Sequence, residues 1–199
     1  MATVTTADGS SYTADYVVSA VPLGVLKHSA IAFSPPLPQE STAAIQQAGF
    51  GNIFKLVMYY DPPSCVDASA CNLPASGWAP SASGVKVYGV ARAPGGATDA
   101  AKREDDFGRG LFTYWVDITA VVSSPGTVDK PCLVGFASGE AAAYMELAPD
   151  SIYLAAANQS LTRLFGGYSS PKRLQRHKWG LDPHARGSRS YWTQGNTHR

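Results

Sequence analysis

The sequence predicts an α+β fold, because separate stretches of the chain have the patterns of strands and of helices. Short runs rich in β-branched, aromatic and aliphatic residues predict strands at residues 16–21, 53–60, 111–116 and 132–137. Alanine-rich or periodically apolar stretches predict helices at residues 39–48, 139–147 and 150–165. The last two strands flank a Ser-Ser-Pro-Gly turn, so they are expected to pair in antiparallel fashion.

Composition excludes several classes of protein. The 199 residues are enough for one domain or parts of two, with 45% hydrophobic and 16% charged residues. A net charge of +1 implies no direct nucleic-acid binding and no attraction to anionic membranes. The chain has neither an apolar run of about 20 residues nor a recognisable signal peptide, so we expect no membrane partner. The sequence indicates no particular compartment.

Cysteine and histidine give no sign of a metal site. Cys65, Cys71 and Cys132 are an odd number without ligand spacing, which favours free thiols over a disulfide framework or zinc. The histidines show neither ligand spacing nor the arrangement of a catalytic triad. A metal-dependent or hydrolytic enzyme is therefore disfavoured.

The N-terminal residues predict a hairpin followed by a buried strand. Asp8-Gly9 is a turn signal between short β-rich arms at residues 4–13. Residues 16–21 are nearly all apolar, which predicts a strand buried on both faces. Pro22-Leu23-Gly24 ends it, and in α/β sheets such strand ends often present backbone to a ligand.

Lys55 lies at the mouth of the predicted central strand. A proline-stiffened connection at residues 34–38 leads into the helix at 39–48, which Gly49 is expected to cap. If the strand that follows is mostly buried, Lys55 would be partly desolvated, and such a lysine can handle protons. The alternative is a lysine whose stem lies on apolar surface while its ammonium stays in water.

The remaining elements follow from local pattern. Residues 61–106 are rich in Pro, Ser, Gly and Ala and predict a long surface excursion with a strand or two, most mobile from about residue 65. Asp150 is expected to cap the last helix, Gly166 to end it, and residues 171–179 to be extended. The residues expected to be buried are Val17, Val18, Val57, Phe112, Val134, Leu161 and Leu164.

Several motifs, taken in order, resemble one family. They are residues 14–27 with Val21-Pro22-Leu23-Gly24, residues 33–55 with Gly49-Phe50-Gly51-Asn52, Gly139-Glu140-Ala141-Ala142, and residues 179–191 with Ala185-Arg186-Gly187-Ser188. Together they cover about half the chain and resemble the flavin-dependent amine oxidases, most closely the polyamine oxidase and lysine-specific histone demethylase branch.

The resemblance implies a division of the chain. Residues 1–26 would be strands of an FAD-binding domain, and residues 27–175 the substrate-binding domain, a mixed sheet flanked by helices. Residues 176–199 would return to the FAD-binding domain. The FAD would be non-covalent, because no cysteine follows Cys132 where monoamine oxidases attach their flavin.

The resemblance also implies roles for individual residues. The lysine matching Lys55 would hold a water against flavin N5 and be the catalytic residue. Contacts with the cofactor are implied for Ala20, Val21, Pro22, Trp179 and Ser188. Arg189 and Tyr191 would line the substrate cavity. The implied reaction transfers a hydride from an amine to flavin N5 and yields an imine and hydrogen peroxide, with a small amine and oxygen as the partners.

Two departures from the family pattern matter. Arg189 stands where the family usually has an aromatic residue, and a cation there would repel a protonated amine, although Tyr191 and Trp192 could partly substitute. The chain also has no GxGxxG fingerprint and no C-terminal flavin block. We therefore expect a central portion of an enzyme, inactive alone and binding FAD only in its full-length parent. The alternative is a non-catalytic truncated remnant or interaction module.

Overall fold

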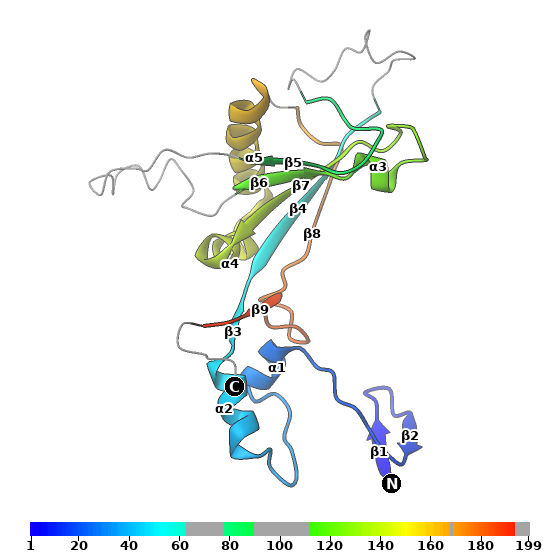
Figure 1. Cartoon of the computed structure of the whole chain (residues 1–199), viewed down its shortest axis with the longest axis vertical. Coiled ribbons are helices and arrows are strands. Elements are labelled where there is room, and N and C mark those ends of the chain that lie inside the picture. The colour runs from blue at the N-terminus through cyan, green and yellow to red at the C-terminus, as the bar shows by residue number, and fades with distance from the viewer. Residues whose placement is uncertain (63–77, 90–111, 168, 194–199) are drawn as a thin grey trace, which may run out of the picture.

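A computed structural model describes residues 1–62, 78–89, 112–167 and 169–193. The molecule is elongated, with a sheet and its helices at one end and a hairpin at the other (Figure 1). That hairpin joins β1 (Ala2–Thr5) to β2 (Ser11–Ala14) in antiparallel register. The hairpin predicted around Asp8-Gly9 is confirmed, and Gly9 has the positive φ of 87° that such a turn requires.

A five-stranded sheet forms the larger end of the molecule. Its order is β5 (Lys86–Gly89), β6 (Tyr114–Asp117), β7 (Cys132–Ser138), β4 (Ile53–Tyr59) and β8 (Arg173–Arg176). Neighbouring strands are antiparallel at each of the described pairings. The α+β class and the predicted strands at 53–60 and 132–137 are confirmed, and the strand predicted at 111–116 begins at Tyr114.

The core lies between this sheet and the helices α4 (Gly139–Leu147) and α5 (Asp150–Phe165). Alternate residues of β4, namely Phe54, Leu56 and Met58, are fully buried against it. The indole of Trp115 donates a hydrogen bond to the Ser160 hydroxyl at 2.8 Å, so this buried N–H is satisfied. Leu161 completes the helix face, as its spacing predicted.

A buried carboxylate organises the connection from β6 to β7. Asp117 accepts hydrogen bonds from the Trp78 indole at 3.2 Å and from the backbone N–H groups of Ser81 and Thr119 at 3.0 and 2.9 Å. Thr119 opens the short helix α3 (Thr119–Val122). Nearby, Cys132 is a buried free thiol; burial, together with the negative charge of Asp117, raises its pKa to about 12.

A smaller unit packs below the sheet (Figure 1). It contains α1 (Leu23–Lys27), α2 (Gln39–Gln47), and the antiparallel pair β3 (Gly49–Gly51) and β9 (Arg189–Tyr191). The Lys27 ammonium donates to the carbonyl oxygens of Ile45, Gln46 and Ala48 at 2.7–3.0 Å, which closes the C-terminus of α2. The predicted cap at Gly49 is wrong, since Gly49 already belongs to β3.

Of the two predictions for the ends of α5, one is confirmed and one is wrong. Gly166 ends α5 in the left-handed conformation with a φ of 75°, as expected for a glycine cap. Asp150 does not cap the start of α5, because Pro149 occupies the N-cap position and Asp150 is the first helical residue. There its carboxylate forms a salt bridge with the Arg176 guanidinium at 2.7 Å.

The prediction of a buried strand at residues 16–21 is wrong. They form no strand in the structure, and Val17 and Val18 are 51% and 90% exposed. A strand buried on both faces needs neighbouring strands and two covering layers, and no described strand pairs with this segment. Phe112, Val134 and Leu161 are buried as predicted, whereas Val57 and Leu164 are only partly buried.

Some expectations lie outside the described residues. Cys65, Cys71 and most of the surface excursion expected to be mobile fall within residues 63–77 and 90–111. In the part of the excursion that is described, β5 is one of the strands expected there. Among the described helices, none combines the length and the apolar character needed to cross a bilayer.

Candidate functional site

A cavity of about 610 Å³ lies where the five-stranded sheet meets the smaller unit. Its lining comes from five separate places in the chain. These residues are Pro22, Leu23, Phe50, Ile53, Lys55, Tyr114, Phe136, Trp179, Ala185, Gly187, Ser188, Arg189 and Ser190. The volume is in the range typical of small-molecule sites.

One wall is aromatic and carries Lys55. The rings of Tyr114 and Phe136, which face each other across β6 and β7, stack at 4.6 Å and 15°. Lys55 pairs with Phe136 across β4 and β7, and its ammonium lies 5.7 Å from the centre of that ring. Lys55 alternates with the buried Phe54 and Leu56, so it projects from the opposite face of β4 into the cavity.

The prediction that Lys55 is partly desolvated is wrong, because its side chain is exposed in the structure. Only one face of the five-stranded sheet carries the core helices, and Lys55 projects from the other face. Its ammonium therefore meets the open cavity and the Phe136 ring rather than a closed apolar layer.

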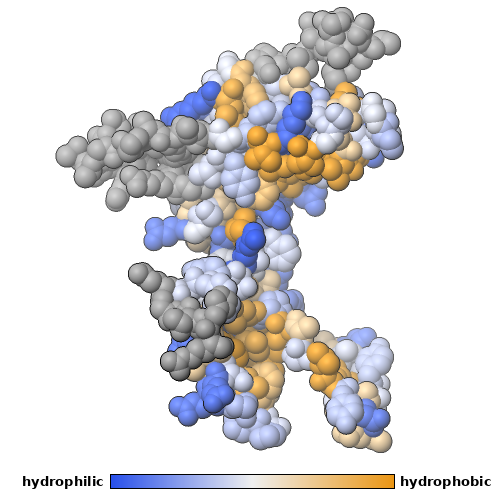
Figure 2. Space-filling view, viewed as in Figure 1, coloured by the Kyte–Doolittle hydropathy of each residue, from blue (hydrophilic) through white to orange (hydrophobic). Residues whose placement is uncertain are grey.

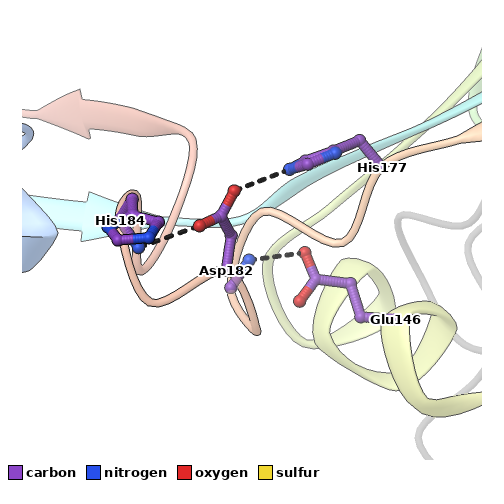
Figure 3. A network of polar contacts seen from close by, with 5 residues as sticks. Glu146, His177, Asp182 and His184 are labelled. Atoms are coloured by element: carbon purple, nitrogen blue, oxygen red, sulfur yellow. Dashed lines mark hydrogen bonds and ion pairs between the residues drawn. The ribbon is translucent and has the colours of Figure 1, made fainter. Parts of the chain in front are cut away.

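A further part of the lining belongs to a loop held by Asp182. Figure 3 shows this carboxylate between His177 and His184. It accepts a hydrogen bond from the backbone N–H of His184 at 2.8 Å and contacts the His177 ring nitrogen at 3.0 Å. The His184 hydrogen bond, assisted by the His177 contact, lowers the Asp182 pKa below its ordinary value of 3.8. The His177 ring also packs on Trp179 at 4.2 Å, which fixes the tryptophan beside the cavity.

Glu146 of α4 anchors the same loop from the side of the core. Glu146 is 1% exposed, and its carboxylate accepts a hydrogen bond from the Gly180 N–H at 2.9 Å (Figure 3). It also accepts one from the Asn52 amide at 3.5 Å. A Cβ at Gly180 would lie 2.3 Å from the Asn52 amide, so only glycine fits this approach. The buried carboxylate therefore ties α4 and Asn52, the residue between β3 and β4, to the residue after Trp179.

Sequence reasoning missed Glu146. The signal for its burial was its position on α4: Glu146 comes four residues after the buried Ala142 and directly after the buried Met145, so it lies on the apolar face of the helix. A glutamate on the apolar face of a helix needs hydrogen-bond donors from elsewhere. Those donors come from segments distant in the sequence, so local pattern alone could not identify them.

Ser188 closes the corner between the two units. Its hydroxyl accepts a hydrogen bond from the Ile53 N–H at 2.6 Å and donates one to the Gly51 carbonyl at 3.2 Å. The single hydroxyl proton is therefore used within the protein, and an incoming ligand could use only the remaining lone pair or the backbone. Gly24 packs against the same loop, where a Cβ would lie 2.5 Å from the carbonyl oxygens of Ala185 and Arg186.

The structure brings together most of the site residues expected from the sequence. Pro22, Lys55, Trp179, Ser188 and Arg189 all line the cavity. Three others do not. Ala20 and Val21 lie in the chain just before Pro22, the first residue of the lining. The Tyr191 ring lies over Gly49 instead, so that a Cβ added at Gly49 would be 2.3 Å from the ring.

The cavity fits the ring of a flavin but offers nothing specific for its phosphates. The aromatic side chains in the lining, Trp179 and Phe136 among them, suit a flat conjugated ring. The sequence contains no glycine-rich loop of the GxGxxG type to receive a pyrophosphate, so we assign no residue to that group. Within the described residues, no group of His, Cys, Asp or Glu is placed to hold a metal ion.

Comparison with known proteins shows the family of the chain. All of residues 1–199 match the family described as flavin containing amine oxidoreductase. A histone demethylase-like protein A of Aspergillus fumigatus is 30% identical over 92% of the chain. The human peroxisomal N(1)-acetyl-spermine/spermidine oxidase is 29% identical over 96%. The chain spans only 15% and 34% of the lengths of these two relatives.

Solved structures share the fold. A triple mutant of a putrescine oxidase superposes with a TM-score of 0.58 at 21% identity, covering 96% of this chain and 34% of that protein. A putrescine oxidase bound to putrescine gives a TM-score of 0.53 at 20% identity, covering 87% of this chain and 30% of the other. At these identities the likeness is one of fold.

Proposed function

Since the chain belongs to the flavin-containing amine oxidoreductase family, we propose that it serves the FAD-dependent oxidation of an amine to an imine, with oxygen reduced to hydrogen peroxide. The observation that carries the proposal is the shared cavity, which both Lys55 and Trp179 line. When FAD is bound, the chemistry it supplies is acceptance of a hydride at N5 and transfer of two electrons to oxygen.

The aromatic lining is proposed to position the reactants. Tyr114, Phe136 and Trp179 form apolar surfaces that exclude water and hold a flat ring and an alkyl amine in fixed orientation. Trp179 is kept in place by His177 on one side and by the Glu146–Gly180 hydrogen bond on the other. Fixed orientation matters because only a well-aligned α-carbon can lose its hydride efficiently.

Lys55 is proposed to handle protons. Its ammonium stands at the cavity wall beside Phe136, from a strand whose neighbouring residues are locked in the core. From there it can hold one water molecule by hydrogen bonding and move a proton at its Nζ atom. That proton transfer would serve hydrolysis of the imine or the reduction of oxygen.

The division into domains is also a proposal. Residues 27–175 would form the substrate-binding domain, and residues 1–26 and 176–199 would contribute to the FAD-binding domain, with the cavity between them. Support comes from the lining, since Pro22, Lys55 and Trp179 each come from one of these parts. We further propose that the FAD is non-covalent, because no cysteine follows Cys132 in the sequence.

Replacing Lys55 tests the function. Lys55→Met keeps the side-chain length and removes the charge, and in the flavin-loaded protein we expect flavin reduction or reoxidation to slow by about 10²- to 10⁴-fold. Stability should change little, because the side chain is exposed. Stopped-flow spectroscopy of both half-reactions gives the rates, and thermal unfolding gives the stability.

The matched control is Lys86→Met, at an exposed lysine of β5 that does not line the cavity. It should leave both rates within about twofold of wild type, a margin far below the general acid–base effect. If Lys55→Met behaves like this control, Lys55 is only a surface lysine of β4 and the proposed role is wrong.

A further inference from the structure

Among the residues that the structure describes, the charged side chains that line the cavity are all cationic. They are Lys55 and Arg189, and this described lining contains neither Asp nor Glu. Within the part of the chain that the structure describes, neither cation is engaged in a salt bridge. The nearby carboxylates of Glu146 and Asp182 are already committed to the loop at residues 177–184. The described part of the chain therefore leaves the positive charge of these two lining residues unbalanced.

Arg189 is presented from a fixed position. It pairs with Gly51 in the β3–β9 ladder, and the preceding residue, Ser188, is bound to Gly51 and Ile53 by three hydrogen bonds. A guanidinium on a fixed backbone loses less freedom when it binds, and its planar set of donors matches a carboxylate with two parallel hydrogen bonds. An exposed arginine on a mobile tail would have no such advantage.

The two cations discriminate among amines by charge. A substrate with a second ammonium group would place like charges together in the cavity, whereas a carboxylate would be attracted and could pair with the guanidinium. The aromatic walls accept the carbon chain between these groups equally well in both cases. Charge, not size, is therefore the property on which this cavity can select.

We propose that the amine oxidised at this site also carries a carboxylate, which Arg189 binds, and that polyamines are poor substrates. This inference rests on the proposed amine oxidation and adds the class of substrate. Arg189 acts here as a specificity residue, because it holds the group remote from the reacting carbon.

The test uses substrates matched in length. The flavin-loaded protein is assayed with ω-amino acids of increasing chain length, and with the monoamine and the diamine of each length. We expect kcat/KM to fall in the order amino acid, monoamine, diamine. In Arg189→Gln, the preference for amino acid over monoamine should fall about 10- to 100-fold, the range expected when one charged hydrogen-bonding partner is lost.

Two further variants control for charge. Arg189→Lys should restore part of the preference, since it returns the charge without the planar donors. Lys86→Gln removes one positive charge from β5, outside the cavity, and should leave the preference within about twofold, because exposed charges at a distance are screened. FAD affinity is measured for every variant.

The outcomes separate this inference from the proposed function. If diamines are the best substrates, or if Arg189→Gln leaves the preference unchanged, the inference is wrong while amine oxidation stands. The inference would also be wrong if Arg189→Gln lost affinity for FAD while its preference for amino acid over monoamine stayed unchanged. Arg189 would then bind the cofactor and not the substrate.

If no amine is oxidised, the proposed function fails, and calorimetry decides the inference alone. The wild-type protein should then bind ω-amino acids more tightly than monoamines by a factor that Arg189→Gln abolishes. Equal affinities would overturn the inference.

Discussion

Strand β4 and the segment at residues 16–21 have similar composition but different environments. Both are rich in β-branched and aromatic residues, yet Phe54 and Leu56 of β4 are fully buried whereas Val18 is 90% exposed. Strand β4 is flanked by β7 and β8 and covered by helices, whereas no described strand pairs with the segment. Figure 2 shows hydrophobic surface on the connection between the hairpin and α1. A strand-forming sequence is thus buried only where partners complete the sheet.

Truncating side chains in the two regions should give the largest difference. Leu161 of α5 is 2% exposed in the core, so Leu161→Ala should lower the free energy of unfolding by about 2–5 kcal/mol. Val18→Ala removes a side chain that buries little surface and should cost less than about 0.5 kcal/mol. Chemical denaturation of both variants and wild type gives the two values.

Similar losses for the two variants would contradict the comparison. A small effect of Leu161→Ala would mean that α5 is not docked on the sheet. A cost above about 1 kcal/mol for Val18→Ala would mean that residues 16–21 are buried in solution, as their sequence predicts.

Adding a methyl group tests how tightly the sheet is packed. A Cβ at Gly135 of β7 would lie 2.7 Å from the Trp115 ring and 2.8 Å from the Phe112 ring, both buried. Gly135→Ala should therefore destabilise the protein by about 1–3 kcal/mol. Gly89→Ala, on the edge strand β5, is the control, because nothing lies within 4 Å of its added Cβ. A neutral Gly135→Ala would show that the two rings can move apart.

These contrasts show which features the sequence could predict. Strands β4 and β7 and helix α5 follow from local periodicity, and their partners lie within the described chain. The roles of Glu146 and Lys27 depend on donors or acceptors far away in the sequence, so no local pattern reveals them. Lys55 lines the cavity, but its exposure depends on which face of β4 the helices cover, and local pattern does not reveal that.

The loop at residues 177–184 should show a smaller effect that depends on pH. Because the Asp182 pKa is lowered in the folded protein, its contribution to stability is present above the unfolded pKa of about 3.8 and is lost as pH falls through the lower folded value. Asp182→Asn should be less stable than wild type at pH 5–7, and the difference should shrink towards pH 3. Unfolding experiments across this range measure it, and a difference independent of pH would mean that the charge of Asp182 does not stabilise the loop.

The central claim is that the cavity between the sheet and the smaller unit receives the flavin ring, with Lys55 at its reactive edge. A crystal structure of the flavin-loaded protein tests it most directly. The account predicts Trp179 beside the ring and the Lys55 ammonium directed at the flavin N5 edge through one bridging water, with hydrogen bonds of about 2.7–3.2 Å on each side. A flavin bound elsewhere, or a Lys55 side chain directed away from the ring, would contradict the account.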